Sequence, residues 1–278
     1  MGLKSRSNSV RMIILLIAIL SIVSGLQAQS WKVQGDYVLP NIDLSQFLAQ
    51  PPLSLQGVDD HGTDLGGIGS DLWHSKANDG PGIYWLITDR GSNGENPRTF
   101  PVPEFTPYIL KVRTVNGTIE ILQAIPVTGL NPATEKGVTG LPNLNNTEEP
   151  PALNEKFYDC FGLAGIELEP NPHGLDTEGI VRTGDGNFWI VEEYGPSILK
   201  VDPQGQVVTR FFPEDLLAFL APITGYNTDD SSVSVPELYG LKRKLNRGFE
   251  GIALSPDEAT LFIALQSPLA NPDTATGQ

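Results

Sequence analysis

Two glutamates occupy equivalent positions in two similar stretches of the sequence, and their carboxylates could serve catalysis or metal binding. Glu178 is the third residue of DTEGIV, and Glu250 is the third residue of GFEGIA. If the two stretches are copies of one unit arranged around an axis, both side chains converge near that axis. Carboxylates held close together either raise one pKa or recruit a cation, and Ca²⁺ takes such oxygen ligands. The alternative is that both are buried structural acids bonded to backbone N–H groups.

A second set of polar residues ends the strand that follows each of these stretches. Asp89, Glu193 and Gln266 each stand four positions after an aromatic residue of an apolar run. Strand ends that open onto loops are common places for functional side chains. We therefore predict that Asp89 and Glu193 join Glu178 and Glu250 as ligands of a bound Ca²⁺.

Two arginines lie beside these acids and could hold an anionic group. Arg90 follows Asp89 directly, and Arg247 lies shortly before Glu250. A guanidinium binds phosphate or carboxylate through two parallel hydrogen bonds. We therefore predict catalytic roles for Arg90 and Arg247 together with Glu178 and Glu250. The alternative is that each arginine only pairs with its neighbouring acid.

The sequence around these residues repeats as a unit of short strands joined by turns. The strand segments of the three copies are 66–68, 84–87, 108–112 and 119–121, then 176–181, 188–191, 197–201 and 207–210, then 248–253 and 261–264. Four antiparallel strands joined by short turns form the blade of a β-propeller. We therefore expect an all-β fold, a β-propeller of four-stranded antiparallel blades.

The third copy stops after two strands, and three units cannot close a ring of typically 4–8 blades. We therefore expect the propeller to be truncated at the C-terminus. Alignment of the copies on their Gly-Ile pairs places Gly66 at the position of Glu178 and Glu250.

One helix is expected at 213–220, where a proline and two acidic residues precede an apolar run.

The N-terminus has the pattern of an export signal. Residues 4–11 carry three basic residues, residues 12–23 are almost wholly apolar, and small residues lead to Ala28. An apolar run of this length is too short for a comfortable membrane span, although an uncleaved anchor is the alternative. We expect a signal peptide at 1–28, a lead-in at 29–54 and the propeller domain at 55–278, in a protein that is secreted or periplasmic.

The charge of the chain excludes some classes of partner. The 33 acidic and 18 basic residues give a net charge of −15. A chain this acidic does not bind nucleic acid through its phosphates or an anionic membrane by charge, whereas it suits cations. The sequence also contains no Gly-x-Ser-x-Gly, P-loop or dinucleotide motif.

Several longer motifs go beyond the general pattern of a repeated blade. They are LDTEGI at 175–180, WIVEEYGPSI at 189–198 and NRGFEGIALSP at 246–256, with TDRG at 88–91 and QSPL at 266–269. Over roughly residues 55–278 the chain resembles the phytase-like esterase family. The resemblance implies an exported propeller that hydrolyses ester or phosphoester bonds, with Tyr194, Arg90 and Arg247 contacting the substrate. The matching motif positions are Asp89, Arg90, Glu178, Glu193, Tyr194, Arg247 and Glu250.

Two functions remain open at this point. The first is a Ca²⁺-assisted hydrolase of a small-molecule ester or phosphoester, in which carboxylates hold the ion and an arginine neutralises developing charge. The alternative is a non-catalytic exported propeller that binds a ligand or partner through its acidic channel. A lactonase-like propeller shares architecture only, and architecture does not fix function.

Overall fold

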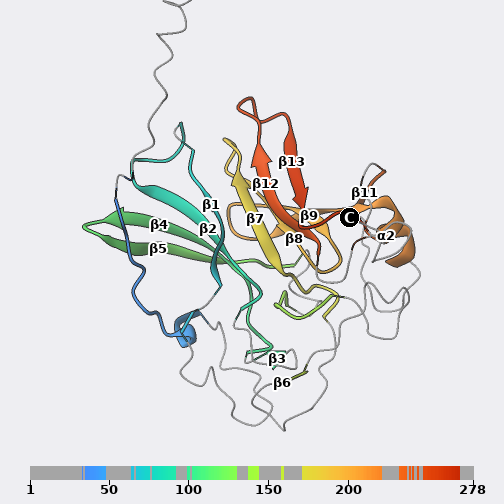
Figure 1. Cartoon of the computed structure of the whole chain (residues 1–278), viewed down its shortest axis with the longest axis horizontal. Coiled ribbons are helices and arrows are strands. Elements are labelled where there is room, and N and C mark those ends of the chain that lie inside the picture. The colour runs from blue at the N-terminus through green and yellow to red at the C-terminus, as the bar shows by residue number, and fades with distance from the viewer. Residues whose placement is uncertain are drawn as a thin grey trace, which may run out of the picture. The chain divides into compact units, whose positions relative to one another are not determined.

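Three β-sheets of two to five strands carry most of the ordered secondary structure of the chain (Figure 1). The structure is a computed structural model, and it describes residues 33, 35–47, 64–65, 67–75, 77–91, 99–100, 102–129, 137–143, 158–159, 171–220, 232–236, 238, 240, 243 and 247–269. The predicted signal peptide at 1–28 and Gly66 lie outside the described residues. Residues 37–278 form one compact unit, to which every element below belongs. Among the described residues, no helix has the length and apolar character to span a bilayer.

The first sheet contains the four antiparallel strands that the first copy of the repeat predicts. In spatial order they are β1 (Ile68–Trp73), β2 (Ile83–Thr88), β4 (Tyr108–Val115) and β5 (Thr118–Pro126). Asn116 and Gly117 form the turn between β4 and β5 with φ angles of 49° and 78°. Both residue types tolerate this left-handed conformation, which two-residue hairpin turns require.

The second sheet contains the four predicted strands and one more. The strands are β7 (Thr177–Arg182), β8 (Phe188–Glu192), β9 (Ser197–Val201), β10 (Val207–Pro213) and β11 (Ser232–Val235). The first four pair antiparallel, and β11 joins the outer edge of β10 in the parallel direction. The predicted helix is present as α2 (Glu214–Leu220), and Pro213 ends β10 instead of starting the helix. The sequence does not predict β11, because this strand has only four residues, Ser-Val-Ser-Val, and lacks the apolar run that marks the other strands.

The third sheet has two antiparallel strands, β12 (Phe249–Leu254) and β13 (Leu261–Leu265). The remaining elements are the 3-10 helix η1 (Leu44–Phe47) and the short parallel pair β3 (Thr99–Phe100) and β6 (Tyr158–Asp159). These elements confirm the all-β class. Within the part of the chain that the structure describes, the sheets do not close into a ring.

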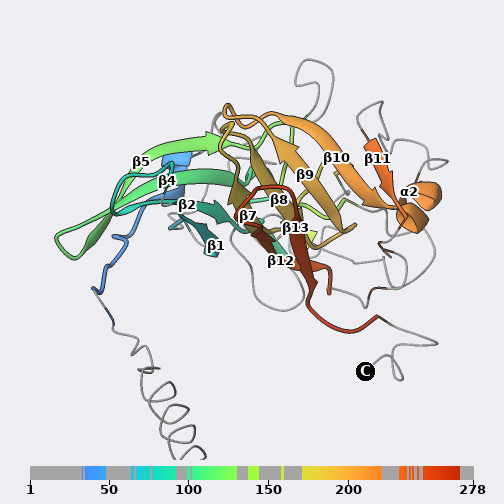
Figure 2. The same ribbon diagram turned by 90° about the horizontal axis from the view of Figure 1, so that it is seen from above.

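The three sheets pack through their first strands, with β7 between β1 and β12 (Figures 1 and 2). Trp85 and Phe188 lie edge to face with ring centroids 5.0 Å apart in the core shared by the first two sheets. The carboxylate of Asp71 accepts a hydrogen bond of 2.9 Å from the backbone N–H of Ile180, which joins β1 to β7. Burial of the two aromatic rings and the hydrogen bond to the backbone N–H of Ile180 both stabilise the packing of the first sheet against the second.

One backbone hydrogen bond recurs in all three sheets and defines which residues are equivalent. The backbone N–H of Asp89 donates to Gly67, that of Glu193 to Asp176, and that of Gln266 to Gly248. The predicted equivalence of Asp89, Glu193 and Gln266 is therefore confirmed. The same bond makes its acceptors, Gly67, Asp176 and Gly248, equivalent to one another.

Glu178 and Glu250 are the extra residues of two equivalent β-bulges. Thr177 pairs with Glu192 and Gly179 pairs with Val191, so Glu178 has no partner of its own on β8. In the third sheet, the pairing skips Glu250 in the same way. A bulge re-aims a side chain and is frequent beside functional sites.

The predicted equivalence of Gly66 with these glutamates is wrong. Ile68 pairs with Thr88 and Asp71 pairs with Ile87, so Gly69 and Ser70 occupy the bulge of the first sheet. The Gly-Ile pairs do not align because Gly67-Ile68 precedes the bulge of its sheet, whereas Gly179-Ile180 and Gly251-Ile252 follow the bulges of theirs. Consequently the first sheet places no carboxylate at this position.

Candidate functional site

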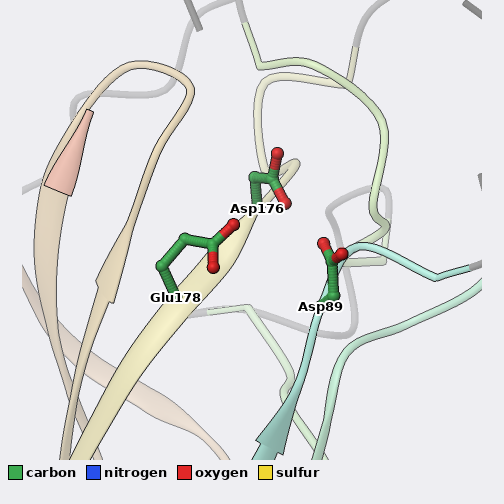
Figure 3. Close-up of side chains that lie close together, drawn as sticks. All are labelled: Asp89, Asp176 and Glu178. Carbon is green, nitrogen blue, oxygen red and sulfur yellow. The ribbon is translucent and has the colours of Figure 1, made fainter. Parts of the chain in front are cut away.

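Three carboxylates from the first two sheets meet in one place (Figure 3). Asp89, Asp176 and Glu178 each place one carboxylate oxygen so that the three oxygens lie within 4.8 Å of one another. Asp89 follows the end of β2, Asp176 immediately precedes β7, and Glu178 lies within β7. Asp176 is almost fully buried, with 2% of its surface exposed, whereas the other two are half-buried.

The local fold explains why these side chains converge. Asp176 and Glu178 are two residues apart at the start of β7, where the bulge turns Glu178 toward the loop end of β2 (Figure 3). Between them, the hydroxyl of Thr177 donates to the backbone carbonyl of Thr88, next to Asp89. This bond fixes the start of β7 against the end of β2.

Glu193 and Glu250 extend the acidic cluster toward the third sheet. Burial raises the pKa of Glu250 to about 7, helped by the charge of Glu193 and a hydrogen bond with its carboxyl group, while Arg247 opposes the shift. Oε1 of Glu193 and Oε1 of Glu250 are buried without a hydrogen-bond donor among the described residues. Two carboxylates can hydrogen-bond to one another only through a shared proton.

Glu178 lies between the two parts of the cluster. Burial, followed by the charges of Asp89, Glu250 and Glu193 in that order, raises its pKa to about 8, while the charge of Arg90 opposes the shift. The predicted metal ligands Asp89, Glu178, Glu193 and Glu250 therefore share one electrostatic environment. Equivalent strands brought the two bulge glutamates together, as the repeat indicates.

Asp176 is a member of the cluster that the repeat and the strand ends do not indicate. Burial raises its pKa well above the ordinary value, an effect that Arg90 opposes and Asp89 and Glu178 reinforce. Its Oδ1 is buried and has no hydrogen-bond partner among the described residues. The available signal was its position two residues before Glu178, which places both on one side of a strand.

Arg90 forms an ion pair with Asp176 and a hydrogen bond with Tyr194. The guanidinium of Arg90 lies 3.6 Å from Oδ2 of Asp176 and donates a hydrogen bond of 2.9 Å to the hydroxyl of Tyr194. It also lies 5.1 Å from the ring centroid of Phe100 and 5.8 Å from that of Tyr194. The Tyr194 hydroxyl donates in turn to the carbonyl of Gly140 at 2.9 Å.

The two predicted arginines therefore occupy different environments. The guanidinium of Arg90 pairs with Asp176, and Asp89 accepts the backbone N–H of Arg90. Only 15% of the Arg90 side chain is exposed, and Tyr194 is 3% exposed. Arg247 is exposed beside Glu250 and is the more accessible cation of the two.

Without divalent cations, we expect the melting temperature to fall as the pH rises from about 5.5 to 8. Glu178 and Glu250 have folded-state pKa values of about 8 and about 7, above their ordinary value of 4.5. A raised folded-state pKa stabilises the protein below the unfolded-state pKa, and this contribution is lost as the pH rises through the folded value. Melting curves in chelator across this range measure the effect, which levels off about one pH unit above the pKa of Glu178.

The double variant Glu178→Gln and Glu250→Gln is the control for this titration. It removes both groups with raised pKa values, so its melting temperature should change less with pH than that of the parent. An identical pH dependence in the parent and the double variant would contradict the assignment.

The family model described as Phytase-like, esterase-like activity of phytase, matches residues 63–278. A protein of Arthroderma benhamiae named "Uncharacterized secreted protein" is 30% identical over 250 residues, which cover 77% of this chain and 47% of that protein. The chain thus spans about half the length of this relative, and no solved structure matches it. Because the family model covers most of the chain, including every residue of the acidic cluster, this protein belongs to the Phytase-like family.

Proposed function

We propose that the chain is part of an exported β-propeller that hydrolyses a small-molecule ester or phosphoester with the help of Ca²⁺. The observation that carries the proposal is the meeting of Asp89, Asp176 and Glu178 within 4.8 Å, with Oδ1 of Asp176 buried and unpartnered among the described residues. The family description supports ester chemistry, and the secreted relative supports export. The side-by-side sheets with repeated bulges support the propeller.

The donor set of this site fits a hard cation. All three candidate ligands are carboxylates, which Ca²⁺ prefers, and the cluster repels itself when all of its members are ionised. When bound, Ca²⁺ would polarise the ester or phosphoester oxygen as a Lewis acid. We propose that Asp89, Asp176 and Glu178 hold the ion and that Glu193 and Glu250 lie at its side facing β12.

The Glu193–Glu250 pair is suited to proton transfer. The pKa of Glu250, about 7 through burial and the proximity of Glu193, lies near the pH at which general bases are efficient. We propose that ionised Glu250 takes the proton of a water molecule as its oxygen attacks the ester carbon or phosphorus. The bond to the alcohol oxygen then breaks, and the alcohol leaves with that proton.

The arginines have separate roles in this proposal. Arg247, exposed beside Glu250, attracts an anionic substrate group. Arg90 and Tyr194 fix the orientation of Asp176 through the contacts described above and act as positioning residues.

Hydrolysis of nitrophenyl acetate and nitrophenyl phosphate in Ca²⁺, in EGTA and after Ca²⁺ is restored tests the proposal. We expect nitrophenol release to require Ca²⁺ and to return when it is restored, and we expect Ca²⁺ to raise the melting temperature. Hydrolysis that is unchanged by EGTA, with no effect of Ca²⁺ on melting, would overturn it.

A non-catalytic role is the second candidate, favoured by the depth at which Asp176 is buried. In that case the cation would stabilise the contact between the first two sheets, and a ligand or partner would bind at the acidic cluster. The same experiment separates the two functions, because Ca²⁺ would raise the melting temperature while neither ester is hydrolysed.

A further inference from the structure

The outer edge of β13 is unpaired among the described strands and carries exposed apolar residues. In the other two sheets, the equivalent strands β2 and β8 pair with a further strand at this edge. Phe262 is 61% exposed and Leu265 is 36% exposed, and no described strand pairs with this edge. The recurring backbone bond and the strand register make Phe262 equivalent to Trp85 and Trp189. Trp85 is only 4% exposed, since it packs against Phe188 in the core of the first two sheets, and β4 pairs with the corresponding edge of β2.

The covering strand has the same sequence in both complete sheets. Residues 109–112 on β4 and residues 198–201 on β9 both read Ile-Leu-Lys-Val. In the antiparallel register, Lys111 lies opposite Trp85 and Lys200 lies opposite Trp189. Each ammonium group lies over the indole that it faces, 5.2 Å from the ring centroid of Trp85 and 5.6 Å from that of Trp189.

We propose that the edge of β13 binds an antiparallel β-hairpin whose first strand reads apolar, apolar, Lys, apolar, with the lysine over the ring of Phe262. If this strand pairs with β13 in the register in which β9 pairs with β8, its four residues lie opposite Ala264, Ile263, Phe262 and Leu261. Main-chain hydrogen bonds along a free sheet edge supply affinity, and side chains at alternate positions supply specificity. The ring of Phe262 gives the cation the same partner that Trp85 and Trp189 give in the other sheets.

The hairpin belongs to a longer polypeptide of the family, and a second copy of this chain fits the edge less well. More than half of the secreted relative lies outside the matched region, which covers 47% of it. Two β13 strands paired edge to edge would bring together only residues of Leu-Phe-Ile-Ala-Leu, which contain no cation for Phe262. This inference rests on strand equivalence and is independent of the proposed hydrolysis.

A synthetic peptide of residues 195–213, which contains β9 and β10, is the probe for this edge. Added to the full chain at saturation, it should slow hydrogen–deuterium exchange of the β13 amides, measured by mass spectrometry. A matched peptide with Lys200→Met should bind about two- to fivefold more weakly, the size of a cation–π contact. The full-chain variant Phe262→Ser, at an exposed site that folding does not need, should remove this difference between the peptides.

Three results would overturn the proposal. They are unchanged exchange of β13 in saturating peptide, equal binding of a scrambled peptide, and self-association of the full chain that protects β13 without peptide. The last result, detected by sedimentation at several protein concentrations, would assign the edge to a second copy.

Discussion

Glutamine in place of Glu178 should stabilise the cation-free protein at pH 8 and remove most of its response to Ca²⁺. Burial and the charges of Asp89, Glu250 and Glu193 raise the pKa of Glu178 to about 8, so ionising it costs folding free energy that a neutral amide avoids. The same change removes one of the three clustered oxygens that we propose as ligands. We expect the Ca²⁺ affinity to fall at least about tenfold and kcat/KM for ester hydrolysis about 100-fold.

The opposite signs of these two effects make the test specific. Isothermal titration measures the Ca²⁺ affinity, and melting in EGTA measures the cation-free stability. Glu120→Gln is the matched control, because Glu120 is 45% exposed and pairs with Arg113 on the surface of the first sheet, away from the cluster. If Glu178→Gln binds Ca²⁺ as the parent does, the ion lies elsewhere; if it also hydrolyses esters as the parent does, Glu178 has no part in the chemistry.

The sequence predicts the strands and their equivalence because both depend on local patterns. Apolar runs, turns and the spacing of aromatic residues locate nearly every strand of the three sheets, and they correctly relate Asp89, Glu193 and Gln266. The bulges are less accessible, since an extra residue leaves no mark on composition. The equivalence of Glu178 and Glu250 is found because the bulges of the second and third sheets lie at the same place in the repeat. Gly66 is assigned wrongly because the Gly-Ile pair of the first sheet lies on the other side of its bulge.

Contacts between sheets account for what the sequence does not reveal. Asp176 joins the cluster because β7 lies against the end of β2, and that contact depends on packing between units far apart in the chain. In the same way, the guanidinium of Arg90 reaches across the sheets to Asp176 and Tyr194, whereas sequence neighbours favour Asp89. Local pattern identifies acidic strand ends, and tertiary packing decides which of them meet.

Glu192 and Glu193 show how one strand end serves both stability and the candidate site. Glu193 faces the acidic cluster, while Glu192 is fully buried within the second sheet. Oε1 of Glu192 accepts hydrogen bonds from Asn143, Ser197 and Arg210, and Oε2 accepts one from the backbone N–H of Tyr194. A buried charge with this many partners is costly to leave without its cation.

Replacement of Arg210 by methionine should therefore destabilise the protein strongly. The guanidinium lies 3.0 Å from Oε1 of Glu192, and both side chains are buried. Removal of one partner of a buried ion pair typically costs about 3–5 kcal/mol in unfolding free energy, because the remaining charge is uncompensated. Urea unfolding at pH 8 measures this loss, and Arg113→Met is the matched control. The Arg113–Glu120 pair is exposed, so its loss should cost less than about 1 kcal/mol.

The pH dependence of the loss identifies its cause. Burial raises the pKa of Glu192 even with Arg210 present to oppose the shift, so removal of Arg210 raises this pKa further. A raised folded-state pKa costs stability as the pH rises above the unfolded value, so the deficit of Arg210→Met should be larger at pH 8 than at pH 5. Adding Glu192→Gln should recover part of the stability lost at pH 8, since it removes the uncompensated charge. A deficit that is equal at both pH values, with no recovery in the double variant, would mean that Arg210 contributes through packing instead of through its charge.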